Sequence, residues 1–298
     1  MKLLLLGGNG QIGCELRRSL PPLGQLLVAT RDGLEADQAA DFEAPEALSS
    51  LVQAIQPEVV VNAAAYTAVD RAESEPDAAF RVNALGPAAL AQACAAVDAL
   101  LVHYSTDYVF DGQSARPYRE DDATAPLGTY GASKLAGEEK IRASGARHVI
   151  LRTSWVYAAH GHNFLRTMLR LAGERDHVRV VDDQWGAPTP AAWIADATAL
   201  LLRQGMRKSG TWNLVAAGQT SWHGFAEAIM EEALVLGLLS RSPAVQPIST
   251  ADSPTPARRP AYSVLDTSRL QADFGIAPPD WREGLRATLR ELTTRSAG

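Results

Sequence analysis

The chain has 298 residues, of which 46% are hydrophobic and 21% are charged, a balance that predicts a globular protein with a substantial core. The net charge is -6 and no block of like charges occurs, so the sequence indicates neither a nucleic-acid polymer nor an anionic membrane surface as a partner. The N-terminal apolar run stops at Gly7, too short for a secretory signal, and no later stretch has the length of a membrane span. Cys14 and Cys94 lack metal-ligand spacing and are typical of reduced thiols, so we expect a cytoplasmic protein.

The first apolar run, residues 2 to 6, predicts a strand buried on both faces of a parallel sheet. Gly7, Gly10 and Gly13 follow it, and then a helical pattern runs through about Leu20. Glycines at this spacing permit a tight turn and the close approach of the backbone to a pyrophosphate, which the N-terminus of the helix favours. We therefore predict a dinucleotide-binding turn, with a merely glycine-rich turn as the alternative.

The second strand is expected from Gln25 to Ala29, followed by Thr30, Arg31 and Asp32. An acidic residue at the end of this strand would bind the ribose 2′-hydroxyl of NAD, whereas an arginine accommodates the 2′-phosphate of NADP. Because Arg31 comes first, we favour NADPH, and Asp32 directly behind it leaves NADH open.

Two later strand patterns end in residues that suit a ligand. Residues 58 to 61 lead to Asn62 and the small residues 63 to 65, which leave room for something flat at the ligand-binding edge of an open α/β sheet. Residues 100 to 104 lead to residues 105 to 107, whose two hydroxyls and carboxylate are expensive to bury unless they are capped or meet a ligand. With a fifth strand from 148 to 152, the alternation of strands and helices predicts an α/β fold with a Rossmann-type doubly wound parallel sheet.

Tyr130 and Lys134 are four residues apart in a helix expected from Tyr130 to Ala143. Residues at this spacing lie on one face of a helix, about 5 to 6 Å apart. A tyrosine has an ordinary pKa of about 10 and is a poor acid-base catalyst unless a nearby cation stabilises its phenolate. Lys134 is the candidate cation, and the alternative is a pair of surface residues on an amphipathic helix.

The pattern loosens after about residue 152, which indicates a second, smaller lobe. A long helical stretch is expected from Thr67 to about Val97, interrupted near Gly86, and a later strand from 178 to 181. We expect residues 1–154, with roughly 177–204, to form the NAD(P)-binding Rossmann domain. Residues 155–176 and roughly 205–298 are expected to form a smaller α/β lobe that binds the substrate.

Several phrases of the sequence resemble one family. The glycines at 7, 10 and 13, Thr106 and the pair Tyr130 and Lys134 look like an extended short-chain dehydrogenase/reductase. The phrases at 105–112, 152–157, 184–189 and 259–266 are similar, in register over nearly the whole chain, to the dTDP-4-dehydrorhamnose reductases. This resemblance implies reduction by NAD(P)H of the C4 ketone of dTDP-4-dehydro-6-deoxy-L-mannose to dTDP-L-rhamnose, the last step of dTDP-rhamnose biosynthesis for polysaccharides.

The resemblance also implies roles for single residues. Tyr130 would give the proton, Lys134 would lower the pKa of the phenol and hold the nicotinamide ribose, and Thr106 would orient the ketone. With the glycines and Arg31 considered above, the expected cofactor contacts are Gly7, Gly10, Gln11, Ile12, Gly13, Arg31, Asp41, Phe42, Ala65, Tyr66, Thr67, Tyr104, Tyr130 and Lys134. The expected contacts to a dTDP-sugar are Val69, Asp70, Thr106, Asp107, Tyr108, Trp155 and Arg259.

Some members of the resembled family are described as dimers that hold magnesium at the interface through glutamates. Glu15 is present, but Ala191-Ala192-Trp193 stands where a further glutamate would be expected, so we expect no magnesium site and leave a homodimer open. His160 and His162 have no third ligand nearby and are interpreted as exposed imidazoles rather than metal ligands.

Two other functions share the expected fold. A sugar-nucleotide epimerase or dehydratase would recycle a tightly held NAD⁺. A non-catalytic NADP-binding regulator would resemble the regulatory subunit of methionine adenosyltransferase. Thr106, Asp107 and Trp155 argue against the regulator, because such a protein needs no ketone-orienting hydroxyl beside a proton donor.

Overall fold

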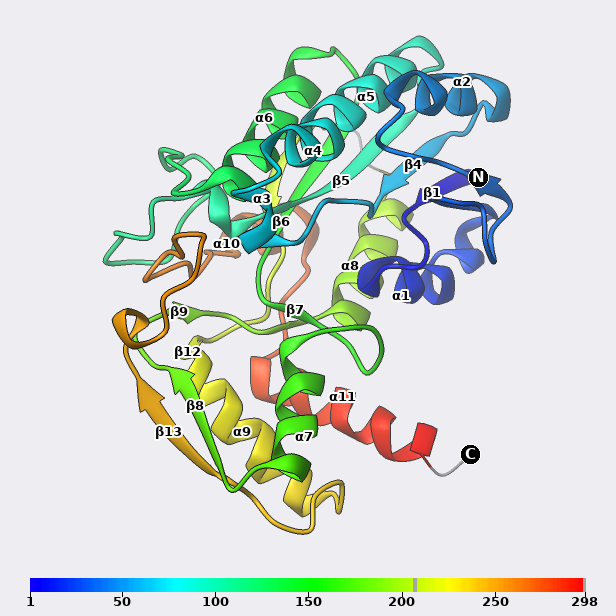
Figure 1. The fold of residues 1–298 in the computed structure, drawn as a ribbon. Coiled ribbons are helices and arrows are strands. Elements are labelled where there is room, and N and C mark those ends of the chain that lie inside the picture. Colours follow the sequence, from blue (N-terminus) through cyan, green and yellow to red (C-terminus); the bar gives the residue numbers. More distant parts are fainter. Residues whose placement is uncertain (206–207, 297–298) are drawn as a thin grey trace.

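A seven-stranded parallel sheet forms the centre of the protein (Figure 1), whose computed structural model describes residues 1–205 and 208–296. The strands, in spatial order, are β11 (Gly210–Asn213), β6 (His148–Thr153), β5 (Leu100–Thr106), β4 (Val59–Asn62), β1 (Lys2–Leu6), β2 (Gln25–Thr30) and β3 (Gln38–Ala39). The chain winds outward from β1 to β2 and β3 and then crosses to β4 on the other side of β1. The predicted doubly wound α/β fold is therefore confirmed, and its switch point lies between β1 and β4.

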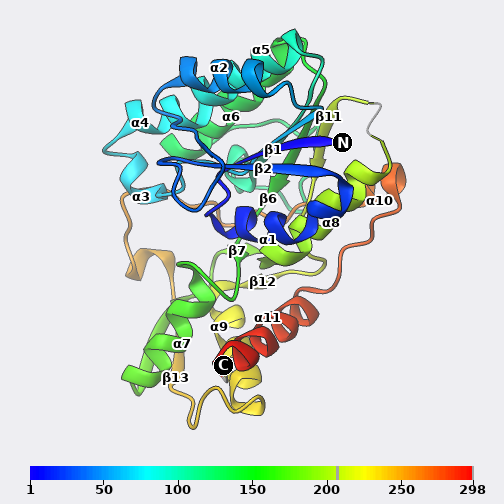
Figure 2. The same ribbon diagram turned by 90° about the vertical axis from the view of Figure 1, so that its right-hand side faces the viewer.

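Helices cover both faces of this sheet (Figures 1 and 2). One face carries α1 (Gln11–Ser19) and α8 (Ala191–Arg203), and the other carries α2 (Pro45–Ile55), α5 (Gly86–Ala96) and α6 (Thr129–Ala143). Successive side chains of a strand point to opposite faces, so Leu3 and Leu5 join the core under α1 and α8, whereas Leu4 and Leu6 join the core under α2 and α5. Burial on both faces explains why β1 is uniformly apolar.

The expected helical stretch from 67 to 97 is divided differently from the sequence prediction. It consists of α3 (Val69–Ala72), α4 (Pro76–Phe80), a π-helical turn over Arg81–Leu85 and α5. The gap lies before Pro76, because proline disfavours a helical conformation in the residue that precedes it. Near Gly86 the chain passes through the π-helical turn without a gap, and a Cβ on Gly86 would lie 2.5 Å from the ring of Phe42.

A second lobe lies below the sheet in both views (Figures 1 and 2). Its helices α7 (Phe164–Glu174), α9 (Trp222–Val235) and α11 (Trp281–Ser296) share a hydrophobic core with the parallel pair β8 (His177–Val181) and β13 (Ala244–Ile248). Smaller elements are β7 (Val156–Tyr157) paired with β10 (Thr189–Pro190), β9 (Trp185–Gly186) paired with β12 (Thr220–Ser221), α10 (Ser268–Phe274), and 3-10 turns at Pro21–Leu23, Asp107–Val109 and Thr250–Asp252.

The two parts of the predicted segment 177–204 lie in different places. Helix α8 packs against α1 on the seven-stranded sheet, whereas β8 pairs with β13 and places Val178 and Val180 in the core of the second lobe. The domain boundaries themselves stay a prediction. Across the described ranges, no helix combines the length and the apolar character that crossing a membrane requires.

Helix α6 is fixed to the sheet by a buried ion pair. Arg152 of β6 donates from Nε to Oε1 of Glu138 at 2.9 Å and from Nη2 to Oε2 at 2.7 Å, and the two side chains are 3% and 0% exposed. Burial raises the pKa of the Glu138 carboxyl, but the hydrogen bonds and charge of Arg152 outweigh it, and the pKa lies below its ordinary value. The pair therefore holds both charges where neither would be stable alone.

Replacing Glu138 by glutamine should lower the free energy of unfolding by about 3 to 5 kcal/mol, because it leaves the Arg152 charge buried without a partner. Urea unfolding of Glu138→Gln measures this loss. The matched control is Glu139→Gln, which makes the same change at the exposed neighbouring position and should stay within about 0.5 kcal/mol of the wild type. Equal effects in the two variants would contradict a stabilising role for the ion pair.

Candidate active site

The predicted site residues gather at the carboxyl-terminal edge of the parallel sheet. Strands β1, β4, β5 and β6 are in parallel register, so the residues that follow them emerge side by side. The glycine turn follows β1, residues 63 to 66 follow β4, and Asp107 follows β5. Open α/β sheets bind their ligands in the crevice at this edge.

The glycine turn has the shape that a pyrophosphate requires. Gly7 has a φ of 75°, and a Cβ on it would lie 2.6 Å from the backbone nitrogen of Ala64. A Cβ on Gly13 would lie 2.0 Å from the carbonyl oxygen of Gly7, so only glycine lets α1 pack this closely on the turn. Gly10 caps α1 without a side-chain hydrogen bond, which leaves the amides of the first helical turn available to an anion.

Arg31 and Asp32 differ in their availability beyond the end of β2. Both residues are exposed, but Oδ1 of Asp32 accepts the backbone N–H of Leu34 at 3.0 Å and lies 3.4 Å from the hydroxyl of Thr30. The carboxylate is thus engaged in its own turn, whereas the Arg31 guanidinium stands at the strand end. This arrangement fits a 2′-phosphate better than a ribose 2′-hydroxyl.

The other expected cofactor contacts differ in which atoms they present. The side chains of Phe42 and Tyr104 are 5% and 6% exposed, and the Tyr104 hydroxyl lies 2.8 Å from that of Thr198 in the core. Tyr66 donates its hydroxyl to Glu75 at 2.7 Å. Around the same edge lie Gln11 and Ile12 at the start of α1, Asp41 after β3, and Ala65 and Thr67 after β4.

Thr106 and Tyr130 meet at the end of β5. The Thr106 hydroxyl donates to Oδ1 of Asp107 at 3.0 Å, and the ring of Tyr108 lies edge-on to that of Tyr130, with centroids 5.7 Å apart. Burial raises the pKa of Tyr130 to about 12, while a hydrogen bond with Thr106 lowers it and the charge of Asp107 raises it. Burial also raises the pKa of Asp107 to about 6, against the hydrogen bond from Thr106. The phenol is therefore protonated at neutral pH.

Lys134 lies one turn along α6 from Tyr130 and is 2% exposed. Its Nζ donates to the carbonyl oxygen of Tyr104 at 2.6 Å and lies 3.3 Å from Nε2 of His103. Burial lowers the pKa of Lys134 to about 8, although the charge of Glu138 raises it. The ammonium thus loses its proton far more readily than an ordinary lysine.

The sequence predicted no role for Asn62 and His103, which lie in a row with Lys134. They are 1% and 0% exposed, and Nδ2 of Asn62 lies 3.0 Å from Nδ1 of His103. The one signal that could have identified them is a polar residue inside, or at the end of, an otherwise apolar strand pattern.

The expected substrate contacts form two groups. In the first, Nη2 of Arg259 donates to Oδ2 of Asp70 at 2.9 Å, and Val69 and Tyr108 line a small pocket that also reaches Tyr130. In the second, Trp155 has a φ of 48°, a left-handed conformation that is strained for a bulky residue. Such strain is often kept at functional sites.

Trp155 is held by Trp222 of the second lobe and by the backbone at Gly186. Its ring stacks on Trp222 with centroids 3.6 Å apart and an interplanar angle of 5°. A Cβ on Gly186 would lie 2.4 Å from the Trp155 ring, so glycine is required beneath it. The tryptophan is thus placed where β6 leaves the sheet for the second lobe.

The interpretation of His160 as an exposed imidazole is wrong, whereas His162 is exposed. His160 is partly buried because its Nε2 lies 2.9 Å from Oε1 of the buried Glu15 on α1. Nearby, Nδ2 of Asn163 donates to Oε1 of Gln11 at 2.9 Å. Within the described residues, no group of three or more histidine, cysteine and acidic side chains could hold a metal ion.

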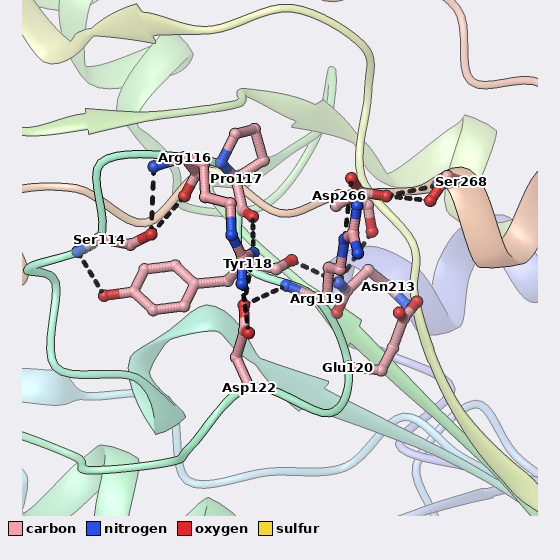
Figure 3. A network of polar contacts seen from close by, with 10 residues as sticks. All are labelled: Ser114, Arg116, Pro117, Tyr118, Arg119, Glu120, Asp122, Asn213, Asp266 and Ser268. Carbon is pink, nitrogen blue, oxygen red and sulfur yellow. Dashed lines mark hydrogen bonds and ion pairs between the residues drawn. The ribbon is translucent and has the colours of Figure 1, made fainter.

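Figure 3 shows the polar network that orders the loop before α6. Asp122 accepts from both terminal nitrogens of Arg116, at 2.9 and 2.7 Å. Asn213 of β11 donates from Nδ2 to the carbonyl oxygens of Tyr118 and Asp266, both at 2.9 Å, and Glu120 accepts the backbone N–H of Asn213 at 2.8 Å. The loop that leads to Tyr130 is therefore anchored to the sheet edge.

Comparisons with known proteins agree with this geometry. The family model described as the RmlD substrate binding domain matches residues 1–294. The chain is 46% identical to dTDP-4-dehydrorhamnose reductase of Escherichia coli strain K12, over 100% of both chains. It is 49% identical to the protein of the same name from Burkholderia thailandensis, over 99% of this chain and 100% of the relative.

A solved structure gives the same result. A dTDP-4-dehydrorhamnose reductase from Bacillus anthracis in complex with NADP superimposes with a TM-score of 0.89 at 35% identity, covering 98% of this chain and 100% of that one. The chain belongs to the dTDP-4-dehydrorhamnose reductase family.

Proposed function

We propose that this protein uses NADPH to reduce the C4 ketone of dTDP-4-dehydro-L-rhamnose, giving dTDP-L-rhamnose. The relatives compared above are named dTDP-4-dehydrorhamnose reductase. The observation that carries the proposal is that the Tyr130 phenol is protonated at neutral pH, has its pKa influenced by Thr106, and lies one turn from the buried Lys134. A ketone that accepts hydride needs a proton donor and a hydrogen-bond donor at its oxygen, and these two groups supply both.

NADPH, when bound, supplies the hydride to C4. The Thr106 hydroxyl, which donates to Asp107 in this structure, would turn its one hydrogen to the ketone oxygen and orient it. Tyr130 gives that oxygen its proton as negative charge develops there. A pKa of about 12 keeps the phenol in its acid form before the reaction. Lys134, fixed by the carbonyl of Tyr104, stabilises the phenolate that results.

The cofactor and the sugar nucleotide are assigned to different parts of the edge. We propose that the first turn of α1 binds the pyrophosphate and that Arg31 binds the 2′-phosphate. Arg259, which pairs with Asp70 in this structure, would bind the diphosphate of the dTDP-sugar, since a guanidinium can donate to two oxygens of one phosphate group. Trp155 would face the sugar from the second lobe.

The chain is also expected to divide into two domains. We propose that the seven-stranded sheet with its helices is the NADPH-binding domain, and that the core formed by α7, α9, α11, β8 and β13 is the sugar-nucleotide-binding lobe. This division places β8 with the second lobe rather than with residues 182–204. A homodimer and a cytoplasmic location stay predictions.

Replacing Tyr130 by phenylalanine should lower kcat at least about a hundredfold and leave the affinity for NADPH unchanged, because only the proton donor is lost. The assay follows NADPH oxidation with enzymatically generated dTDP-4-dehydro-L-rhamnose. Tyr262→Phe is the control, because its hydroxyl bonds to Gln219 rather than to Thr106. Near-normal turnover in Tyr130→Phe would overturn the assignment.

The same assay separates the alternative functions. An epimerase or dehydratase would be purified with stoichiometric NAD⁺ and would not consume NADPH. A regulator would bind NADPH without oxidising it in the presence of any 4-keto sugar nucleotide. We expect NADPH oxidation that depends on the keto sugar.

Replacing Arg31 by alanine should weaken NADPH binding about tenfold or more and leave NADH binding unchanged, because a charge-assisted hydrogen bond to the 2′-phosphate is lost. Fluorescence titration of the protein with each nucleotide measures both affinities. Arg203→Ala, at an exposed arginine that ends α8, is the matched control and should change neither affinity. An equal loss of affinity for both nucleotides would contradict the role of Arg31.

A further inference from the structure

Lys134 is the last member of a buried polar row that crosses two strands and a helix. Its Nζ lies 3.3 Å from Nε2 of His103 on β5, and Nδ1 of His103 lies 3.0 Å from Nδ2 of Asn62 on β4. The three residues are 2%, 0% and 1% exposed. The reaction proposed above assigns no role to His103 or Asn62.

The orientation of Asn62 fixes the position of the proton on His103. Oδ1 of Asn62 accepts the backbone N–H of Ala64 at 3.0 Å. A flip of the side-chain amide would place its NH₂ group against this N–H, so that two donors would face each other. Nδ2 of Asn62 therefore faces His103, and an amide NH₂ can only donate. Nδ1 of His103 must accept this bond, and a neutral imidazole then carries its proton on Nε2.

The Nε2 proton points at Lys134. An ammonium has three N–H donors and no acceptor, so a charged Lys134 would place two donors face to face in a site without solvent. A neutral amine has a lone pair that accepts the Nε2 proton, while one of its own hydrogens donates to the carbonyl oxygen of Tyr104 at 2.6 Å. The other imidazole tautomer does not remove the conflict, because it would set Nδ1–H against the amide of Asn62.

We propose that His103, held in its Nε2–H tautomer by Asn62, is a positioning residue that stabilises the neutral amine of Lys134. Lys134 then acts as a proton donor to the phenolate rather than only as a fixed positive charge. The kinetic consequence rests on the proposed reduction, whereas the tautomer and the protonation of Lys134 do not.

The protons balance over one turnover. Tyr130 gives its proton to the ketone oxygen that hydride has reduced, which leaves a hydroxyl on the sugar and a phenolate on the protein. The ammonium of Lys134 returns one proton to the phenolate and becomes an amine, which accepts the hydrogen bond from His103. Water restores the ammonium, so each turnover takes up one hydride from NADPH and one proton from solvent.

Other charged groups lie around Lys134 but have other partners. Glu138, one turn further along α6, raises the pKa of Lys134 but is itself paired with Arg152 of β6. Asp107, in the turn after β5, acts on Tyr130. Burial keeps the pKa of His103 well below its ordinary value, and the charge of Lys134, when it is protonated, lowers it further, so the imidazole is neutral. Within the described chain, the ring nitrogens of His103 have Asn62 and Lys134 as their hydrogen-bond partners.

The tautomer is tested in the ligand-free wild-type protein. The chain has six histidines, and nitrogen-15 chemical shifts of labelled histidine rings distinguish the two neutral tautomers and the cation. The resonances of His103 are assigned by their loss in His103→Gln. We expect the Nε2–H tautomer at neutral pH, and an Nδ1–H tautomer or an imidazolium would overturn the proposal.

The protonation of Lys134 is tested with carbon-13-labelled lysine, since the chain has four lysines, Lys2, Lys134, Lys140 and Lys208. The resonance that is lost in Lys134→Arg identifies Lys134. In His103→Leu its titration midpoint should rise by about 1 pH unit, because the bond that favours the amine is gone. In His103→Gln, whose amide again offers an N–H, the midpoint should return toward that of the wild type.

A matched control separates this effect from loss of a buried histidine in general. His148 is 9% exposed, and its Nδ1 lies 2.9 Å from the carbonyl oxygen of Ala146, so His148→Leu should leave the Lys134 midpoint unchanged. An unchanged midpoint in His103→Leu, or an equal rise in His148→Leu, would overturn the proposal.

The kinetic arm uses the pH profile of kcat. The alkaline limb, where Lys134 has lost its proton, should move upward in His103→Leu with the titration midpoint, while KM for NADPH changes less than about twofold. A loss of kcat that is equal at every pH would show a merely structural role and contradict the proposal. If the wild type reduces no 4-keto sugar nucleotide, the proposed function fails, and the two spectroscopic measurements still decide the state of His103 and Lys134.

Discussion

The hydrogen bond from the buried amino group of Lys134 to the carbonyl of Tyr104 is the interaction on which the arrangement of the site depends. A polar group is expensive to bury without a partner, so α6 must come close enough to β5 for this carbonyl to reach Nζ. Glycines let α6 pack closely on its neighbours. A Cβ on Gly131 would lie 2.2 Å from the carbonyl oxygen of Tyr108, in the turn after β5, and a Cβ on Gly137 would lie 2.1 Å from that of Asn83, in the π-helical turn. The ion pair of Glu138 with Arg152 then fixes the helix, and with it the phenol one turn away.

Much of the fold and part of the site could be predicted, because their signals are local. Short stretches of sequence suffice to recognise the apolar strands, the glycine turn and the spacing of Tyr130 and Lys134. Strands β3 and β11 were missed because they are short and lack an apolar run. The role of His103 depends on the register in which β4 pairs with β5, because this register places it beside Asn62. No local sequence pattern predicts that register.

In this structure, side chains assigned to the substrate already have partners within the protein. Arg259 binds Asp70, although the two are 189 residues apart in the chain, and Trp155 stacks on Trp222 of the second lobe. A diphosphate would therefore replace an existing carboxylate rather than meet a free guanidinium, which reduces the net gain from that contact. A ligand that displaces one of these partners binds best when its charge and shape match the group that it replaces. These pairs therefore contribute to selectivity as well as to stability.

The position of β11 at the edge of the sheet has a consequence for biosynthesis. The chain leaves the sheet after β6, builds α7 and β8 of the other lobe, and returns for α8 and β11 before it leaves again. While the protein emerges from the ribosome, β6 therefore remains an open edge of an apolar sheet until β11 has been made. An unpaired edge of this kind invites association with other chains. Chaperone contact during translation should accordingly concentrate on the interval between these two strands.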